Sequence, residues 1–203
     1  MVRSPPEQDP PSPHDAAAGD DGLTAIRAQL AAQRYPPVHR FTPAHCGEID
    51  IRIGRDGRWY YRGTPIARPE MVRLFASVLR REGRRYYLVT PVEKLEITVE
   101  DAPYVAVEMS RLGRDGAQTL VFRLQTDEIV IADSEHPVRI EKDPATGGPR
   151  PYIRVRDALD ALIARPVYYE LADLAAPAAD DPDCLGVWSA GTFFPLGRID
   201  EGG

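Results

Sequence analysis

Cationic and polar side chains in the first half of the chain are of the types that bind small anions. The interval from Arg52 to Arg85 holds ten arginines and three acidic residues. The planar guanidinium matches phosphate or carboxylate oxygens in a two-point contact. Arg68 and Arg73 are the strongest candidates, because Arg68 precedes an expected helix whose first N–H groups favour an anion and Arg73 lies one turn further on.

A second group of candidates lies in the stretch Thr90-Pro91-Val92-Glu93-Lys94. It combines a hydroxyl, a stiffened backbone and two opposite charges at an expected strand end, where binding residues collect. Lys94 is one of two lysines beside 23 arginines, which suggests a requirement for a compact ammonium group. Asp101 and the phenol of Tyr60 complete the set of candidate ligand-binding residues. A salt bridge from Lys94 to Glu93 or Asp101, serving only to fix the loop, explains the same residues equally well.

Six other arginines of this interval are typical of solvated turns and helix ends. They are Arg55, Arg58, Arg80, Arg81, Arg84 and Arg85.

Patterns typical of enzymes are weak in this sequence. Ser189 misses the nucleophile-elbow spacing, and no phosphate-binding loop or dinucleotide fingerprint is present. We therefore predict no catalytic residue, no cofactor and no metal. The candidate metal ligands are scattered without the spacing of a zinc site: His39, His45, Cys46, His136 and Cys184.

The elements around the candidate site can be read from periodicity and turn residues. Isoleucines alternate from Ile49 to Ile53, and an Asp-Gly turn then leads into a returning strand over 58–62. A helix is expected from Pro69 to about Glu82, closed by Gly83, and a buried strand over 86–89. We expect Trp59 to pack against this helix at Leu74 or Phe75.

This order of elements predicts that Arg68, Arg73 and Lys94 converge on one concave surface. Residues 83–85 are too few to carry the chain back along the helix. The following strand should therefore run antiparallel to the helix and bring the Thr90 loop toward the helix N-terminus.

The rest of the chain reads as a meander of antiparallel strands over residues 95–142, followed by three further elements. These are a strand over 152–155, a helix over 156–164 and a strand over 167–171. Aromatic residues Trp188, Phe193 and Phe194 predict that the C-terminal tail folds back onto the body.

Several of these segments resemble an uncharacterised bacterial family, domain-of-unknown-function family 1285. The most specific are YYLVTPVEK, which ends at Lys94, and VEDAP, which contains Asp101. The resemblance covers roughly residues 46–171. It implies an α+β fold with a duplicated core, a second half similar to pleckstrin-homology-like barrels, and a nucleotide-like ligand between the halves. It implies no catalytic activity.

A duplication can also be argued from the residues, since hairpin, proline turn, helix and a tyrosine-containing strand occur twice. Trp59–Ile66 then corresponds to Ile129–Val138, and Tyr86–Leu88 to Tyr168–Leu171. The Gly-Arg-Asp-Gly turn occurs at 54–57 and again at 113–116. It does not fit this alignment, so we interpret it as ordinary hairpin chemistry.

We therefore predict an α+β protein of two related halves. Residues 1–22, rich in proline and acids, are expected to be disordered, residues 23–94 to form the first half and residues 95–203 the second. A short helix over 23–34 should dock through Leu23, Ile26, Leu30 and Ala31.

Composition and charge limit the partners and the compartment. No apolar run is long enough for a membrane helix, and two cysteines without an export signal favour the reduced cytoplasm. An acidic pI of about 5.3 argues against a nucleic-acid polymer as partner.

The favoured function is non-enzymatic binding of a small anionic, nucleotide-like ligand between the halves, in a regulatory or signalling role. One alternative is a hydrolase or transferase that uses Glu93, Asp101 and Lys94 for proton transfer. Another is a protein–protein interaction module.

Overall fold

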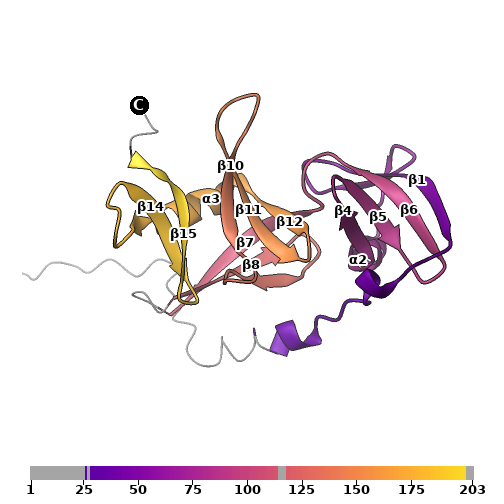
Figure 1. The fold of residues 1–203 in the computed structure, drawn as a ribbon, viewed down its shortest axis with the longest axis horizontal. Coiled ribbons are helices and arrows are strands. Elements are labelled where there is room, and N and C mark those ends of the chain that lie inside the picture. The colour runs from indigo at the N-terminus through magenta and orange to yellow at the C-terminus, as the bar shows by residue number, and fades with distance from the viewer. Residues whose placement is uncertain (1–25, 27, 114–117, 200–203) are drawn as a thin grey trace, which may run out of the picture.

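The computed structural model describes residue 26, residues 28–113 and residues 118–199. The disorder expected for residues 1–22 concerns a segment outside these ranges. Figure 1 shows the strands and helices with the labels used below. Their bounds are η1 Val38–Arg40, β1 His45–Ile53, β2 Trp59–Tyr61, β3 Thr64–Pro65, α2 Pro69–Ser77, β4 Leu79–Glu82, β5 Arg85–Val89, β6 Glu93–Val99, β7 Tyr104–Leu112, β8 Thr119–Leu124, β9 Ile129–Ile131, β10 Val138–Lys142, β11 Pro149–Arg156, β12 Leu159–Ile163, α3 Arg165–Ala172, β13 Ala176–Pro177, β14 Cys184–Ser189 and β15 Thr192–Arg198.

Two six-stranded sheets form the two halves, and both have the same topology. The strand order is β3-β2-β1-β6-β5-β4 in the first and, read in the same sense, β9-β8-β7-β12-β11-β10 in the second. Each sheet consists of two antiparallel three-stranded meanders joined by one parallel pair, β1 with β6 and β7 with β12. The α+β class and the two similar halves are therefore confirmed.

The correspondence between the halves differs from the expected one. β1 to β6 correspond in order to β7 to β12, whereas Trp59–Ile66 was aligned with Ile129–Val138. In this register both Gly-Arg-Asp-Gly sequences connect the first two strands of a half. The Gly-Arg-Asp-Gly repeat therefore fits the observed correspondence between the halves, although it does not fit the expected one. The boundary expected between residues 94 and 95 falls inside β6, which belongs to the first sheet through Val99.

The helix that starts at Pro69 is shorter than expected, because its last turn is replaced by a strand. α2 ends at Ser77, and β4 pairs antiparallel with β5 from Leu79 to Glu82. Gly83, with φ of +59°, closes the hairpin between them rather than the helix. Leucine and arginine at these positions fit the period of a helix as well as that of a strand. Pairing with β5 outweighs their weak preference for a helix.

The helix and the strand expected near residue 160 are interchanged in the structure. Residues 159–163 form the central strand β12, and residues 165–172 form α3. Pro166 lies in the first helical turn, where its missing N–H costs nothing, and Val167 and Leu171 are buried one turn apart. A short, mostly apolar run such as this cannot be assigned from periodicity alone.

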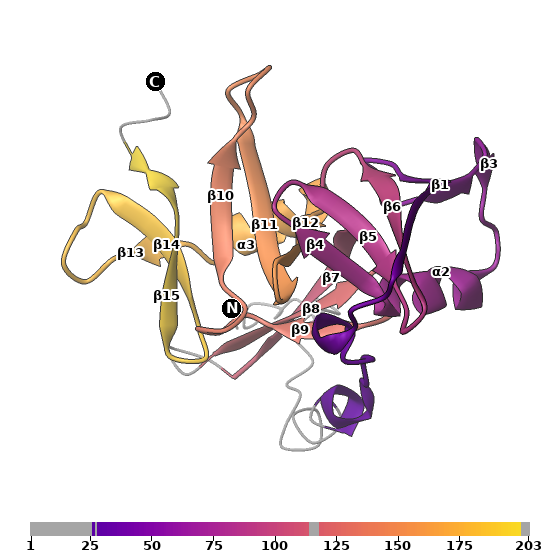
Figure 2. The same cartoon turned by 45° about the vertical axis from the view of Figure 1, so that its right-hand side comes forward.

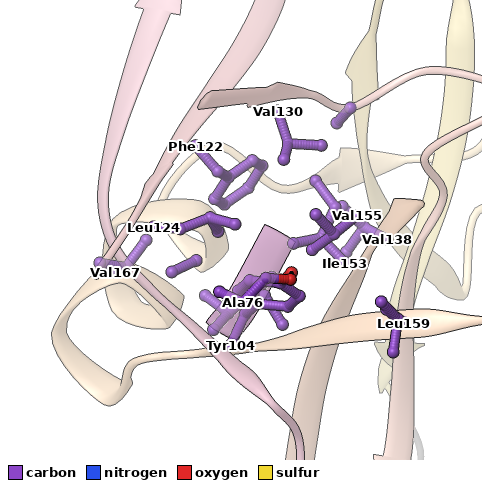
Figure 3. Close-up of a cluster of buried hydrophobic side chains, with 14 of the residues drawn as sticks. Ala76, Tyr104, Phe122, Leu124, Val130, Val138, Ile153, Val155, Leu159 and Val167 are labelled. Atoms are coloured by element: carbon purple, nitrogen blue, oxygen red, sulfur yellow. The ribbon is translucent and has the colours of Figure 1, made fainter. Parts of the chain in front are cut away.

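The largest hydrophobic core spans both sheets and includes α2 and α3. Figure 3 shows its centre, where side chains of β8, β9, β10 and β11 point toward one another and Ala76 of α2 lies beside Tyr104. Trp59 is buried and stacks on Phe75 with ring centroids 6.1 Å apart, which confirms its expected contact with the helix. Leu74, the other expected partner, is exposed.

The C-terminal tail docks as expected and forms the small sheet β13-β14-β15. Val187, Phe194 and Leu196 are buried in the main core. The buried hydroxyl of Ser189 donates to the Ala132 carbonyl at 2.6 Å and accepts from the Leu120 amide at 2.8 Å. Ser189 therefore fastens the tail to the second half and has a structural role.

The N-terminal segment, defined here as residues 28–43, crosses from the second half to the first (Figure 2). Ile26 and Leu30 pack against a small cluster of Leu112, Val121 and Ile129, which confirms part of the expected docking face. The Gln33 side chain accepts from the Ile129 amide at 2.5 Å and donates to its carbonyl at 3.0 Å. Further on, η1 contacts β4. The segment therefore links the edge of each sheet.

Candidate functional site

A cavity of about 540 Å³ lies where the N-terminal segment, the first half and the second half meet. We call it the junction cavity. Its lining residues come from all three parts: Val38, His39, Phe41, Thr42, Pro43, Cys46, Arg80, Arg81, Glu82, Lys94, Asp157, Ala158 and Leu159. Cavities of this size between structural units are common sites for small ligands.

Three cations and two carboxylates line the junction cavity, so its formal charge is positive by one. Glu82 lies between two of the cations, with its carboxylate 3.0 Å from the Lys94 ammonium and 2.5 Å from an Arg80 nitrogen. The hydrogen bond from Lys94, together with Arg80, lowers the pKa of Glu82 below its ordinary value. Lys94 also lies 4.7 Å from the centre of the Tyr87 ring. The Lys94 ammonium thus contacts the Glu82 carboxylate and the Tyr87 ring.

Arg80 and Arg81 connect the cavity walls. Arg80 donates to the carbonyls of Val38 and Phe41 at 3.0 and 2.9 Å, which holds the N-terminal segment against β4. Arg81 donates to the Ala158 carbonyl at 3.3 Å and lies 3.6 Å from the Asp160 carboxylate in the second half. Because they lie on adjacent positions of a strand, the two arginines reach opposite walls.

Sequence reasoning missed Arg80 and Arg81 because it placed them at a solvated helix end. Their side chains are only 19% and 31% exposed. The strand assignment would have followed from treating Gly83 as a hairpin residue, since Arg80 and Tyr87 then pair directly.

A polar cluster next to Ala76 joins the two halves at a second point. The Arg156 guanidinium donates to the Ala76 carbonyl at 2.6 Å and to the Tyr104 hydroxyl at 2.9 Å. It also stacks on the ring of Tyr35 at 4.2 Å. Burial raises the pKa of the nearby Glu128 carboxyl, against the opposing pull of Arg156. A carboxyl in this environment favours its neutral form more than it would in water.

Of the expected ligand-binding residues, Lys94 lines the junction cavity, and Thr90 and Glu93 lie beside it in sequence. The Thr90 hydroxyl accepts from the amides of Val92 and Glu93, at 3.3 and 3.1 Å, so it shapes the turn before β6. Glu93 starts β6 and pairs with His45 of β1. These contacts favour a structural role for Thr90.

The other four expected residues lie elsewhere. Arg68 lines an apolar hollow beside α2, and Arg73 lines a separate cavity and contacts Asp127 at 2.8 Å. Asp101 accepts from Arg150 at 2.6 Å and from the Tyr152 hydroxyl at 2.7 Å.

Tyr60 lies under the Arg52 guanidinium, which is 4.1 Å from its ring centre. Lys94 and Asp101, two of the residues considered for proton transfer, line different cavities.

The expected convergence of Arg68, Arg73 and Lys94 is therefore wrong. The three cations line three different cavities. The amide of Val89 donates to the carbonyl of Val78 at 2.9 Å, so the chain returns to the C-terminal end of α2 and not to its N-terminus. The cause is β4, which adds a strand between the helix and the turn.

The region of the chain that the structure describes contains no helix with the length and apolar character needed to cross a membrane.

Comparison with known proteins gave matches of one kind. The model of the N-terminal domain of the domain of unknown function DUF1285 matches residues 36–102, and the model of its C-terminal domain matches residues 103–196. The search of curated proteins gave no match.

Two solved structures are similar to this chain. The crystal structure of a DUF1285 family protein from Silicibacter pomeroyi DSS-3 is 47% identical, with a TM-score of 0.78 over 88% of this chain and 96% of that one. A DUF1285 family protein from Shewanella baltica OS155 is 26% identical, with a TM-score of 0.48 over 61% of this chain and 90% of that one. The two family models together span both halves, from the N-terminal segment to β15, and on this ground the chain belongs to the DUF1285 family.

Proposed function

We propose that this protein binds a small anionic, nucleotide-like ligand in the junction cavity without chemically converting it. The observation that carries the proposal is the meeting of Arg80, Arg81 and Lys94 at one cavity bounded by both halves. A phosphate or carboxylate there would find a two-point guanidinium partner and a compact ammonium group.

Glu82 gives this proposal a specific mechanism. Its carboxylate occupies the position between Arg80 and Lys94 that a ligand anion would take. Binding would then exchange an internal anion for an external one, and Glu82, whose side chain is 41% exposed, can turn to solvent. Removing the Glu82 charge should tighten anion binding, whereas a purely structural ion pair would give only a loss of stability.

The ligand would also bear on the N-terminal segment, since Val38, His39 and Phe41 form one wall of the cavity. A ligand that contacts this wall and β4 together would stabilise the contact between them. A change in the position or mobility of the segment is a signal that a partner protein could read. The proposal therefore includes a regulatory or signalling role, with the cytoplasm as the proposed compartment. The proposal also includes a similarity of the second half to pleckstrin-homology-like folds.

Thermal unfolding in the presence of ATP, AMP, GTP or inorganic pyrophosphate tests the proposal. A ligand at 100 times its dissociation constant adds about 2.7 kcal/mol to the free energy of unfolding, which gives a measurable rise in Tm. Lys94→Gln and Arg81→Gln should remove this rise, and Glu82→Gln should increase it.

Arg85→Gln is the matched control. Arg85 lies on β5, contacts Glu96 at 3.4 Å and is not among the lining residues of the junction cavity. Its replacement should leave the ligand-induced rise in Tm unchanged. The proposal fails if none of the four compounds raises the Tm of the wild-type protein, or if Lys94→Gln retains the full effect.

A further inference from the structure

A second hollow, of about 450 Å³, lies on the first half between α2 and the strands β1 to β3. We call it the α2 hollow. It shares no lining residue with the junction cavity. Its lining is apolar apart from a threonine, a tyrosine hydroxyl and one arginine: Ile49, Ile51, Tyr61, Thr64, Pro65, Ile66, Ala67, Arg68, Met71 and Phe75.

The walls of the α2 hollow leave apolar surface in contact with water. Tyr61 and Met71 are 42% and 40% exposed, although both are large and apolar. Scattered apolar side chains are normal on a protein surface, but a concave group of them marks a binding site more often than a flat surface does. A ligand that fills the hollow would remove this surface from water.

One charged group stands at the edge of the hollow. Arg68 is the residue that precedes α2, with an extended backbone and no side-chain hydrogen bond to the first helical turn. Within the described ranges, the structure gives Arg68 no salt-bridge partner. Arg68 therefore brings a guanidinium to an apolar surface next to the start of α2, which suits a carboxylate attached to an apolar body.

We propose that the α2 hollow binds an amphipathic carboxylic acid, with its hydrocarbon body against Ile49, Met71 and Phe75 and its carboxylate at Arg68. A volume of about 450 Å³ lies within the range of small-molecule sites, roughly 300–1,000 Å³. The site is separate from the anion site of the junction cavity, since the two share no lining residue. Its affinity would come from apolar contact along the hydrocarbon body and from one charged contact at the carboxylate end.

Titration calorimetry with dodecanoate, below its micelle concentration, tests this proposal on the full chain. The wild-type protein should bind one equivalent, and dodecanol should bind more weakly because it lacks the charge. Met71→Glu should abolish binding, since it places a carboxylate on the apolar wall. Leu74→Glu is the matched control: Leu74 is 62% exposed on the same helix and does not line the hollow, so its replacement should leave binding unchanged.

The role of Arg68 has its own readout. Arg68→Gln should weaken dodecanoate binding about tenfold, as expected for a charge-assisted hydrogen bond, and should leave dodecanol binding unchanged. Lys94→Gln should affect neither.

Four outcomes would overturn the proposal: no saturable binding, equal losses in Met71→Glu and Leu74→Glu, equal losses of acid and alcohol in Arg68→Gln, or wild-type dimers in sedimentation that Met71→Glu dissociates. The last result would identify the hollow as an interface between two copies of this chain.

Discussion

The Arg156 guanidinium of the second half donates to the main-chain carbonyl of Ala76, in the last turn of α2, at 2.6 Å. A second, longer bond of 3.4 Å reaches the carbonyl of Leu79. The last carbonyls of a helix have no partner within the helix, so a cation from elsewhere can satisfy them and also oppose the helix dipole. A helix end of one half is thus capped by the other half.

Arg156→Met should lower the free energy of unfolding by about 1.5–3 kcal/mol, because it removes charged hydrogen bonds to a buried helix-terminal carbonyl, which keeps the Tyr104 hydroxyl as a donor at 3.0 Å. Urea denaturation followed by far-UV circular dichroism measures this change. Arg165→Met is a suitable control, because Arg165 is exposed and bonds only to the Tyr169 hydroxyl among the described residues. A change of more than about 0.5 kcal/mol in the control would indicate a general effect of losing positive charge.

Glu128 should make stability depend on pH in an unusual direction. Burial raises the pKa of Glu128 in the folded protein above its ordinary value of 4.5. The folded state therefore holds the proton more tightly than the unfolded state, and the contribution is favourable below pH 4.5 and declines as pH rises through the folded pKa. Stability measured from pH 4.5 upward should fall more in the wild-type protein than in Glu128→Gln. Equal pH profiles would show that the carboxyl is not buried in solution.

The turn at Gly57 should be sensitive to any side chain, because it faces the other half. Gly57 has φ of +78°, and a Cβ placed there would lie 2.8 Å from a methyl carbon of Val105 on β7. Gly63 has a similar φ of +75° but no atom within 4 Å of such a Cβ. Gly63→Ala should therefore cost about 1–2 kcal/mol from backbone strain alone.

Gly57→Ala should cost a further 1–3 kcal/mol, roughly, from the clash between halves. Guanidinium denaturation of the two variants isolates this difference. Equal costs would mean that Val105 can move away freely.

The N-terminal segment should depend on Gln33 more than on the neighbouring Gln29. Gln33 makes two hydrogen bonds to the backbone of Ile129, whereas Gln29 makes one exposed bond of 3.3 Å to Asp127. Gln33→Leu should cost about 1–3 kcal/mol and increase hydrogen exchange at the Ile129 amide, which loses its acceptor. Gln29→Leu should change neither quantity appreciably. Unaltered exchange at Ile129 in Gln33→Leu would show that the segment does not cover β9 in solution.

The sequence predicted those features of the fold that rest on strong local patterns. Alternating isoleucines located β1, and the Pro69 start of α2 and the docking of the aromatic tail follow from proline geometry and the cost of exposing aromatic rings. The assignments failed at Leu79–Glu82 and Leu159–Ile163, where short segments fit two periods and only their neighbouring strands decide.

The candidate site was only partly predictable for the same reason. The rarity of Lys94 identifies it, but the sequence pattern predicts a helix end at Arg80 and Arg81 and predicts Arg68 and Arg73 as the partners of Lys94. One misplaced strand was enough to reverse the direction of the chain after α2. Contacts between halves, such as Arg81 with Ala158, join residues 77 positions apart and leave no local signal.

The parallel pair at the centre of each sheet also has a kinetic consequence. Neighbouring strands within each meander are close in sequence. The parallel pairs that join the meanders are not: Glu48 pairs with Glu96 and Tyr104 with Ala161, at separations of 48 and 57 residues. Hairpins form in about 1–10 μs, whereas long-range pairings must first overcome the entropy of closing a large loop. Each half should therefore assemble its two meanders early and close its sheet late. Substitutions in the outer strands β3 or β10 should then slow folding, whereas equally destabilising ones that disturb only the parallel pair should mainly speed unfolding.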